Sequence, residues 1–476
     1  MMEVDVAVLG GGPGGYTAAI RAAQLGARVV CIDRAPELGG TCLRIGCIPT
    51  KAWAQTALAL RESEQTFAKL GIGLSGAELD FSRANEWKAH AVKRMTDGVA
   101  FLFKKNGVQW VQGTGTFKDA HTLGVDSGDD VHFDSGIVAT GSFPIWPAIE
   151  GLESDLCVDS EGLLGQTEVP GRLLILGGGD IGCEFASMFQ RFGSDVTIIE
   201  RLPTLLAQED LAVSNELAKQ FRRRGIKLEL NHQCTKVEAD GAELTIHYGD
   251  GQTIKADLML VAVGRRPLVD GLGLETTGVA FDRLTGIGTD TGRHTSVRHL
   301  YAVGDCAGYW QFAHTAFREG EVAAENACGR DTVVDNRAVP RPIYTDPEIA
   351  SVGLTESQAR KRHGEEIATG TFPWLANARA VMQDEHTGWV KSIHHTRTGE
   401  LLGLVMVGPH VTDMVQAGVI AIDLHATVEN IAHSIAPHPT LSEAIRGAAQ
   451  LALGSAIDVP NSKIPEATRP TAQSGT

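Results

Sequence analysis

The chain has 476 residues, of which 43% are apolar and 21% charged, and its formal net charge is −16. At roughly 150 residues per domain this length predicts about three domains, while the composition excludes a disordered or fibrous protein and the charge argues against nucleic-acid or polybasic membrane binding. The chain has no apolar run long enough for a transmembrane helix, and eight cysteines are too few for a secreted disulfide scaffold, so we expect a cytoplasmic protein.

The first segment has the pattern of a dinucleotide-binding unit. Alternating apolar residues at 4–8 predict a strand, and helical spacing follows at 16–25. A second strand at 28–32 ends on Asp33, and the early start of the first strand predicts that no signal peptide is present. The intervening G-x-G-x-x-G glycines are Gly10, Gly12 and Gly15. Such glycines let the backbone approach a pyrophosphate at a helix N-terminus, and the acid accepts ribose hydroxyls.

Two cysteines follow this turn in the run GGTCLRIGCIPTK, where Cys42 and Cys47 are five positions apart. In an ideal helix their α-carbons would lie roughly 8 to 9 Å apart, beyond the limit of about 7 Å for a disulfide. A bridge therefore needs a distorted turn, for which Gly46 and Pro49 are suitable helix breakers. If Cys47 begins the next helix, the helix N-terminus favours its thiolate and Lys51 lies on the same face. The alternative is a pair of core thiols, and the spacing does not suit zinc.

A second segment repeats the layout of the first. A constant offset of 167 residues separates Gly10 from Gly177 and Asp33 from Glu200. The repeated glycines are Gly177, Gly179 and Gly182. One such turn is a weak signal, but two copies, each between a strand and a helix and each followed by an acid, predict two dinucleotides, one flavin and one nicotinamide. Glu200 would repel a 2′-phosphate, so NAD is preferred over NADP.

The rest of the chain has three further features. Each unit closes on a similar apolar strand that runs into Gly and Pro, at 137–144 and 260–267. Another apolar strand ends on Asp305, which could hold a cofactor hydroxyl or cap a helix. From residue 339 onward alternating β segments predict a separate sheet, with helices at 413–424 and 440–453.

The sequence resembles the flavin-dependent pyridine nucleotide–disulfide oxidoreductases over about residues 3–455, and among them most resembles the dihydrolipoamide dehydrogenases. The resemblance is carried by GGGPGGY, GGTCLRIGCIPTK, GGGDIGCE, YAVGDCAG, IYTDPEIASVGLTE, FPWLANARA and HPTLSEA. It implies an α/β fold with two Rossmann-like dinucleotide-binding domains and a C-terminal α+β dimerisation domain. The implied boundaries are 1–146 (FAD domain, first part), 147–268 (NAD domain), 269–338 (completing the FAD domain), 339–456 (interface domain) and 457–476 (disordered tail).

The resemblance also implies roles for single residues. Cys47 would be the thiol beside the flavin and Cys42 the outer thiol that exchanges with substrate, while Lys51 would pair with Glu184. FAD would be bound by Gly10, Gly12, Gly15, Asp33 and Asp305, and NAD by Gly177, Gly179, Gly182 and Glu200. The cofactor-binding set further includes Lys51, Thr140, Gly141 and Gly264. No metal site is predicted.

The run HPTLSE would supply the catalytic base. A thiol–disulfide exchange needs a base that titrates near neutral pH, and histidine is the natural group. By resemblance, His438 acts across a homodimer on the partner's Cys42, Glu443 orients its ring, and the His438–Pro439 peptide is cis. His314 is interpreted as structural.

The implied reaction is oxidation of a protein-bound dihydrolipoyl group through a Cys42–Cys47 disulfide, with reduction of NAD to NADH. The partner would be a lipoylated carrier protein or an acyltransferase of a multienzyme complex. One alternative is a glutathione- or mycothione-type reductase. A mercuric reductase would carry a C-terminal cysteine pair, whereas the last cysteine here is Cys328. A flavoprotein scaffold without activity would have no use for the cysteine pair.

Asp180, four residues before Glu184, departs from the family pattern. A carboxylate there would oppose a negatively charged ligand and slow NADH entry or tune the direction of the reaction. The alternative is that Asp180 caps the following helix.

Overall fold

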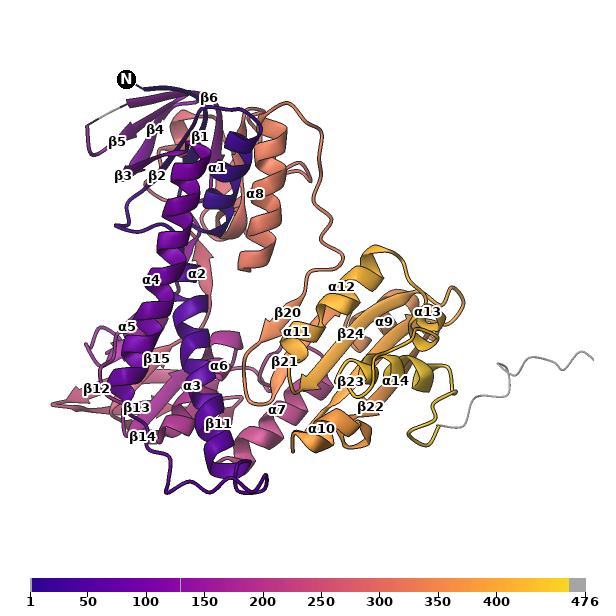
Figure 1. Ribbon diagram of the computed structural model, residues 1–476. Helices are drawn as coiled ribbons and strands as arrows, with labels where there is room; N and C mark the ends of the chain where they lie inside the picture. Colours follow the sequence, from indigo (N-terminus) through magenta and orange to yellow (C-terminus); the bar gives the residue numbers. More distant parts are fainter. Residues whose placement is uncertain (1, 129, 462–476) are drawn as a thin grey trace, which may run out of the picture.

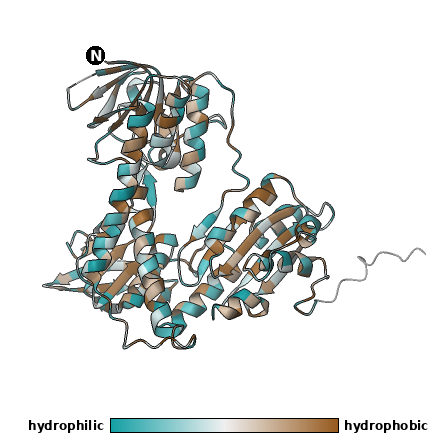
Figure 2. Ribbon diagram, viewed as in Figure 1, coloured by the Kyte–Doolittle hydropathy of each residue, from teal (hydrophilic) through white to brown (hydrophobic). Residues whose placement is uncertain are grey.

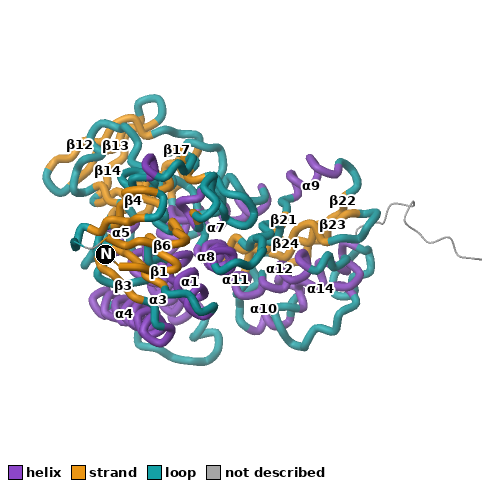
Figure 3. Tube along the Cα trace, turned by 90° about the horizontal axis from the view of Figure 1, so that it is seen from above, coloured by secondary structure: helices purple, strands orange, loops and turns teal. Residues whose placement is uncertain are grey.

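The computed structural model describes residues 2–128 and 130–461, so the predicted tail lies outside the described residues from 462 onward. Two α/β units and a C-terminal domain are distinct in Figure 1. Seen from above in Figure 3, the two α/β units lie together on one side and the C-terminal domain on the other. Within residues 2–128 and 130–461, no helix combines the length and apolar character needed to span a bilayer.

The first unit is built on a seven-stranded sheet in the order β3-β2-β1-β6-β5-β4, with β19 paired to β6. Its elements from the first half of the chain are β1 (Met2–Leu9), α1 (Pro13–Gln24), β2 (Val29–Asp33), α2 (Gly40–Ile45), α3 (Cys47–Gln65), α4 (Phe81–Asn106), β3 (Gln109–Gln112), β4 (Gly115–Asp119), β5 (Thr122–Val125), β6 (Asp130–Val138) and β7 (Ser142–Pro144). The predicted strand at 4–8 is confirmed as part of β1, which runs parallel to β2 and β6 at the centre of the sheet.

A later segment returns to this first sheet. It contains η1 (Leu274–Thr276), β17 (Phe281–Asp282), β18 (Gly286–Ile287), β19 (Leu300–Ala302), η2 (Gly304–Ala307) and α8 (Ala313–Ala327). β19 runs parallel to β6, with Leu300 opposite Gly136. α8 packs along α1. At their contact Gly320 lies so close to the Gly14 carbonyl that a Cβ at this position would not fit. This return places the strand that ends before Asp305 next to the first glycine turn.

The second unit has a parallel five-stranded sheet in the order β11-β10-β9-β15-β8 and a separate antiparallel sheet, β12-β13-β14. Its elements are β8 (Cys157–Val158), α5 (Ser160–Leu164), β9 (Arg172–Leu176), α6 (Asp180–Phe192), β10 (Asp195–Glu200), α7 (Leu211–Arg223), β11 (Lys227–Leu230), β12 (Cys234–Asp240), β13 (Glu243–Tyr248), β14 (Gln252–Ala256), β15 (Leu258–Val261) and β16 (Arg265–Pro267). α6 is followed by its C-cap Gly193, whose φ of +105° is a left-handed conformation that glycine adopts without strain.

The two similar closing segments of the sequence pair with each other. β7 and β16 form an antiparallel ribbon in which Arg265 lies opposite Pro144 and Pro267 opposite Ser142. The ribbon therefore joins the two nucleotide units just after β6 of the first unit and β15 of the second unit end.

The C-terminal domain has an antiparallel five-stranded sheet in the order β20-β21-β24-β23-β22. Its elements are β20 (Arg341–Ile343), β21 (Glu348–Gly353), α9 (Glu356–His363), β22 (Ile367–Pro373), η3 (Trp374–Ala376), α10 (Ala378–Met382), β23 (Trp389–His395), β24 (Leu401–Gly408), α11 (Val411–Met414), α12 (Gln416–Asp423), α13 (Val428–Ala432) and α14 (Glu443–Ala452). The helix predicted at 413–424 is divided at Val415, and the one predicted from 440 begins at Glu443. Figure 2 shows the strands of this sheet as largely hydrophobic.

Candidate active site

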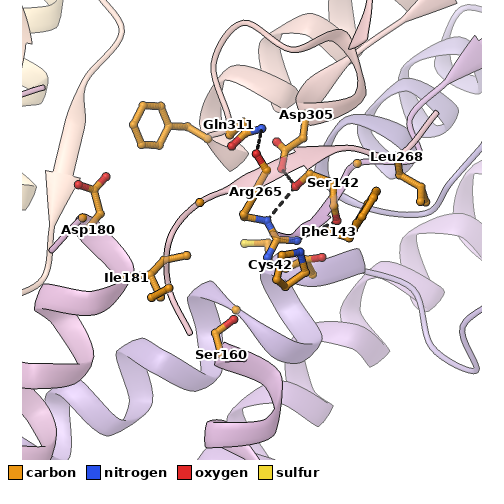
Figure 4. Close-up of a pocket in the computed structure, with 18 of the residues that line it drawn as sticks. Cys42, Ser142, Phe143, Ser160, Asp180, Ile181, Arg265, Leu268, Asp305 and Gln311 are labelled. Carbon is orange, nitrogen blue, oxygen red and sulfur yellow. Dashed lines mark hydrogen bonds between the residues drawn. The ribbon is translucent and has the colours of Figure 1, made fainter. Parts of the chain in front are cut away.

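A cavity of about 1270 Å³ runs between the two nucleotide units. Both glycine turns, both closing segments, the two neighbouring cysteines and Asp305 line it. Figure 4 shows a part of this cavity, with Asp180 and Ile181 at the start of α6, and Cys42 and Arg265 nearer to Asp305. The fold therefore brings almost all of the predicted site residues to one space.

The two glycine turns have nearly the same backbone. φ is +108° at Gly10 and +113° at Gly177, and a Cβ at either position would meet a carbonyl oxygen of the neighbouring strand end at 2.3 or 2.4 Å. Gly15 and Gly182 each pack against the carbonyl of the first glycine of their turn, which a Cβ would approach to 1.8 or 2.1 Å. The first and last glycines of each motif are thus required by a backbone contact.

The acids predicted to hold the ribose lie beside these turns. Asp33 accepts hydrogen bonds from the Gly11 N–H at 2.5 Å and the Ala35 N–H at 2.8 Å. Glu200 accepts equivalent bonds from the Gly178 and Leu202 N–H groups, both at 2.6 Å. Each carboxylate is therefore fixed at the end of its strand, with further lone pairs free to accept a hydroxyl.

The structure can accommodate two dinucleotides. A Cβ at Gly12 would come no closer than 3.7 Å to another atom, and one at Gly179 would find nothing within 4 Å. These two glycines precede α1 and α6 and line the cavity, so the amide-rich helix N-termini are open to a pyrophosphate. Thr140, Gly141 and Gly264, three further members of the predicted cofactor-binding set, also line this cavity.

Cys42 and Cys47 lie on either side of a break between two helices. Cys42 is in α2, Gly46 separates the two helices, and Cys47 is the first residue of α3. The condition for a thiolate favoured by the helix N-terminus is therefore met. The structure has no disulfide bond between Cys42 and Cys47, so each thiol can be described separately. A hydrogen bond from the Cys42 thiol lowers the pKa of Cys47, burial opposes this effect, and the Lys51 ammonium lowers that pKa further. The same hydrogen bond and burial raise the pKa of Cys42.

Lys51 and Glu184 form an ion pair beside the thiols. The Lys51 Nζ lies 2.8 and 3.0 Å from the two carboxylate oxygens of Glu184, which also accepts the Tyr344 N–H at 2.9 Å. Burial disfavours the charge on Lys51, but the Glu184 carboxylate outweighs it and the pKa of Lys51 is raised. Lys51 therefore keeps a positive charge close to Cys47.

A hydrogen-bonded chain that the sequence does not predict holds Asp305. Ser142 Oγ donates to Asp305 at 2.5 Å, and Arg265 donates to Ser142 Oγ and to its carbonyl, both at 2.8 Å (Figure 4). Ser142 follows Gly141 and Arg265 follows Gly264, so the only signal in the sequence was their place in the closing segments. These hydrogen bonds join Arg265, at the end of the second unit, to Asp305 of the first unit.

Asp180 is the first residue of α6, where Gly179 is the N-cap and no side chain makes a capping bond. The helix-capping interpretation is therefore wrong, because the chain reaches the cap position one residue earlier. The Asp180 side chain is exposed to the cavity, and the surrounding protein shields it from bulk water. This desolvation raises the pKa of Asp180 to about 6, and the charges of Glu184 and Glu209 add to the shift.

His438 and Glu443 contact each other but not the cysteines. His438 Nδ1 lies 2.9 Å from Glu443 Oε1, and the Thr440 N–H donates to the other oxygen of Glu443 at 2.8 Å. His438 is 71% exposed and does not line the cavity. It lies between α13 and α14 in the C-terminal domain, which Figure 1 places apart from α2. The His438–Pro439 peptide is cis, as the resemblance implies. His314 donates from Nε2 to the Pro340 carbonyl at 2.8 Å.

Comparison with known proteins agrees with this geometry. The chain matches the family described as pyridine nucleotide-disulphide oxidoreductase over residues 4–320 and the dimerisation domain of that family over 339–449. It is 38% identical over 462 residues to the dihydrolipoyl dehydrogenase of Bacillus subtilis, covering 95% of this chain and 100% of the relative. It is 37% identical over 468 residues to dihydrolipoyl dehydrogenase 3 of Pseudomonas aeruginosa, covering 96% and 100%.

A solved structure is similar in the same way. The HOCl-induced flavoprotein disulfide reductase RclA from Escherichia coli has a TM-score of 0.86 at 28% identity, covering 94% of this chain and 99% of that one. These matches confirm the resemblance and the fold class predicted from the sequence. With one family matching it along almost its whole length, the chain belongs to the pyridine nucleotide–disulphide oxidoreductases.

Proposed function

We propose that this enzyme oxidises protein-bound dihydrolipoyl groups to the lipoyl disulfide and reduces NAD to NADH. The observation that carries the proposal is the Cys42–Cys47 thiol pair at the helix break, beside the Lys51–Glu184 ion pair and in a cavity shared by two dinucleotide cradles. Relatives at 37 and 38% identity are named dihydrolipoyl dehydrogenases, which supports the choice of substrate.

The thiol chemistry follows from the two pKa shifts. In the oxidised enzyme a substrate thiolate attacks Cys42 Sγ, and Cys47 leaves as a thiolate that its lowered pKa stabilises. The second substrate thiol then displaces Cys42, so the lipoyl disulfide forms as the enzyme disulfide becomes a dithiol. A flavin held at Gly10, Gly12 and Asp33 would supply two-electron transfer between the dithiol and a nicotinamide held at the second turn. Lys51 stabilises negative charge at Cys47 throughout.

The substrate thiol must give its proton to a base, and His438 does not line the cavity of its own subunit. His438 is exposed in the dimerisation domain, and Glu443 holds its Nδ1 so that Nε2 is left to accept a proton. We therefore place His438 in the site of the partner subunit of a homodimer, where it would act on the partner's Cys42.

The substrate is tested by NAD reduction with dihydrolipoamide and by reduction of glutathione disulfide. We expect turnover of dihydrolipoamide, faster with NAD than with NADP, because Glu200 opposes a 2′-phosphate. Cys47→Ser should lose more than about a thousandfold in rate, whereas the matched control Cys328→Ser, outside the cavity, should keep it. Faster turnover of glutathione disulfide would contradict the assignment.

The shared site is tested with hybrid dimers of Cys42→Ser and His438→Gln subunits. Each parent dimer should be nearly inactive. A hybrid has one site that carries both substitutions and one that carries neither, so it should regain about half of the wild-type activity per dimer. Inactive hybrids would show that His438 acts within its own subunit.

Net charge and cysteine usage indicate the partner and the compartment. The net charge of −16 suits a basic docking segment on a lipoylated carrier protein or acyltransferase. A reducing cytoplasm would keep the remaining six cysteines as thiols, and their small number does not suit a secreted disulfide scaffold.

A further inference from the structure

The two glycine turns differ at the first residue of the helix that follows. The offset of 167 residues places Asp180 of α6 at the position that Pro13 occupies in α1. The contacts of the shared glycines are matched. The next position also differs, Gly14 against Ile181, but neither residue is charged, so Asp180 is the change of charge at this turn. A helix N-terminus attracts an anionic ligand, whereas a carboxylate at the first helical residue repels such a ligand.

The charge of Asp180 is not neutralised by its neighbours. No hydrogen bond or ion pair joins it to another residue in the described part of the chain. The two nearby cations are engaged elsewhere, Lys51 with Glu184 at 2.8 Å and Arg341 with Glu209 at 2.7 Å. Asp180 therefore presents an unpaired carboxylate to the cavity.

Its position is on the path between the second cradle and the redox centre. Asp180 lies inside the Gly177–Gly182 turn, and one helical turn later Glu184 contacts Lys51 beside Cys47. A dinucleotide held by this turn must bring its reactive ring toward that centre, and Asp180 lines the same cavity. The oxidised nicotinamide ring carries a positive charge, whereas the reduced ring is neutral.

We propose that Asp180 makes the second dinucleotide site select by redox state, favouring NAD⁺ over NADH. This inference rests on the proposed function only in that the second site takes a nicotinamide dinucleotide. Any repulsion between Asp180 and the pyrophosphate is the same for both forms and cancels in the ratio of their dissociation constants. The attraction for the charged ring does not cancel. In the proposed reaction, Asp180 would thus limit inhibition of the enzyme by the product NADH.

The test measures binding without turnover. Dissociation constants for NAD⁺ and for a tetrahydronicotinamide dinucleotide, whose ring is neutral and cannot transfer a hydride, are determined by calorimetry on the oxidised FAD-bound enzyme. Asp180→Asn should lower the preference for NAD⁺ about tenfold, because it removes one charge from a partly desolvated site. Asp180→Glu keeps the charge and should keep the preference, and the matched control Asp250→Asn, exposed on the same unit and outside the cavity, should not change it.

The preference should also depend on pH. The charged and titratable groups around Asp180 are Cys183 and Glu184 on α6, Glu209, Lys51 and Arg341. Wild-type preference should fall between about pH 7.5 and about pH 5, as Asp180 takes up a proton, and Asp180→Asn should show no such fall. Equal changes in both dissociation constants, or an unchanged ratio, would overturn the proposal. No dihydrolipoyl substrate is used in this test, so its result does not depend on whether the substrate assignment is correct.

Discussion

The first and second nucleotide units use one backbone cradle for different purposes. Their turn glycines differ by only a few degrees in φ, and both turns donate an N–H to the acid at the end of the next strand. The first unit adds α2 and α3 with the cysteine pair, and β19 returns with Asp305, whereas the second adds Asp180 at its helix start. The cradle thus determines where a pyrophosphate binds, and the residues that depart from the repeat determine what each half does.

The largest effects should come from adding a methyl group to each cradle. Gly10→Ala and Gly177→Ala each combine a left-handed φ with a Cβ placed 2.3 or 2.4 Å from a carbonyl oxygen. The strain alone costs on the order of 1 to 3 kcal/mol, and the contact adds to it. We expect Gly10→Ala to lose FAD and Gly177→Ala to keep FAD while NAD binding falls below detection. Flavin absorbance per chain and calorimetry with NAD measure the two outcomes.

Gly26→Ala and Gly193→Ala are the matched controls. They also have positive φ and the same offset of 167 residues, but a Cβ there would meet nothing within 4 Å. They should lower the unfolding temperature slightly and leave both cofactors bound. Loss of FAD from Gly177→Ala alone would show that the two cradles do not bind their cofactors independently.

The sequence predicted those features that depend on local spacing. The glycine turns, the acids and the helix break at Gly46 all follow from residues within one short segment. Contacts between distant segments could not be found in this way. The ribbon of β7 and β16 and the bond from the Tyr344 N–H to Glu184 join residues more than a hundred positions apart, and domain packing sets them. Asp180 was the instructive case, because an acid near a helix start fits both a cap and a first-turn residue.

A smaller effect should separate the cysteines next to the two cradles. Cys47 beside the first has a lowered pKa, whereas burial raises the pKa of Cys183, whose thiol donates to the Gly178 carbonyl at 3.4 Å beside the second. Cys42→Ala removes the hydrogen bond that lowers the pKa of Cys47 most, and Lys51→Gln removes only the weaker charge effect. Both variants should therefore raise that pKa, Cys42→Ala more.

The pH dependence of iodoacetamide labelling, followed by peptide mass spectrometry on the reduced enzyme, measures this shift. A raised pKa leaves less thiolate at neutral pH, so the labelling rate of Cys47 should fall about tenfold in Cys42→Ala and by a smaller factor in Lys51→Gln. Cys183 should stay unlabelled in all three proteins because its thiol is buried. If Lys51→Gln had the larger effect, the ammonium and not the neighbouring thiol would be the main stabiliser of the thiolate. The lowered pKa of Cys47 would then depend mainly on Lys51, which Glu184 of α6 holds in place. The contact between the two units would therefore set the reactivity of the thiol.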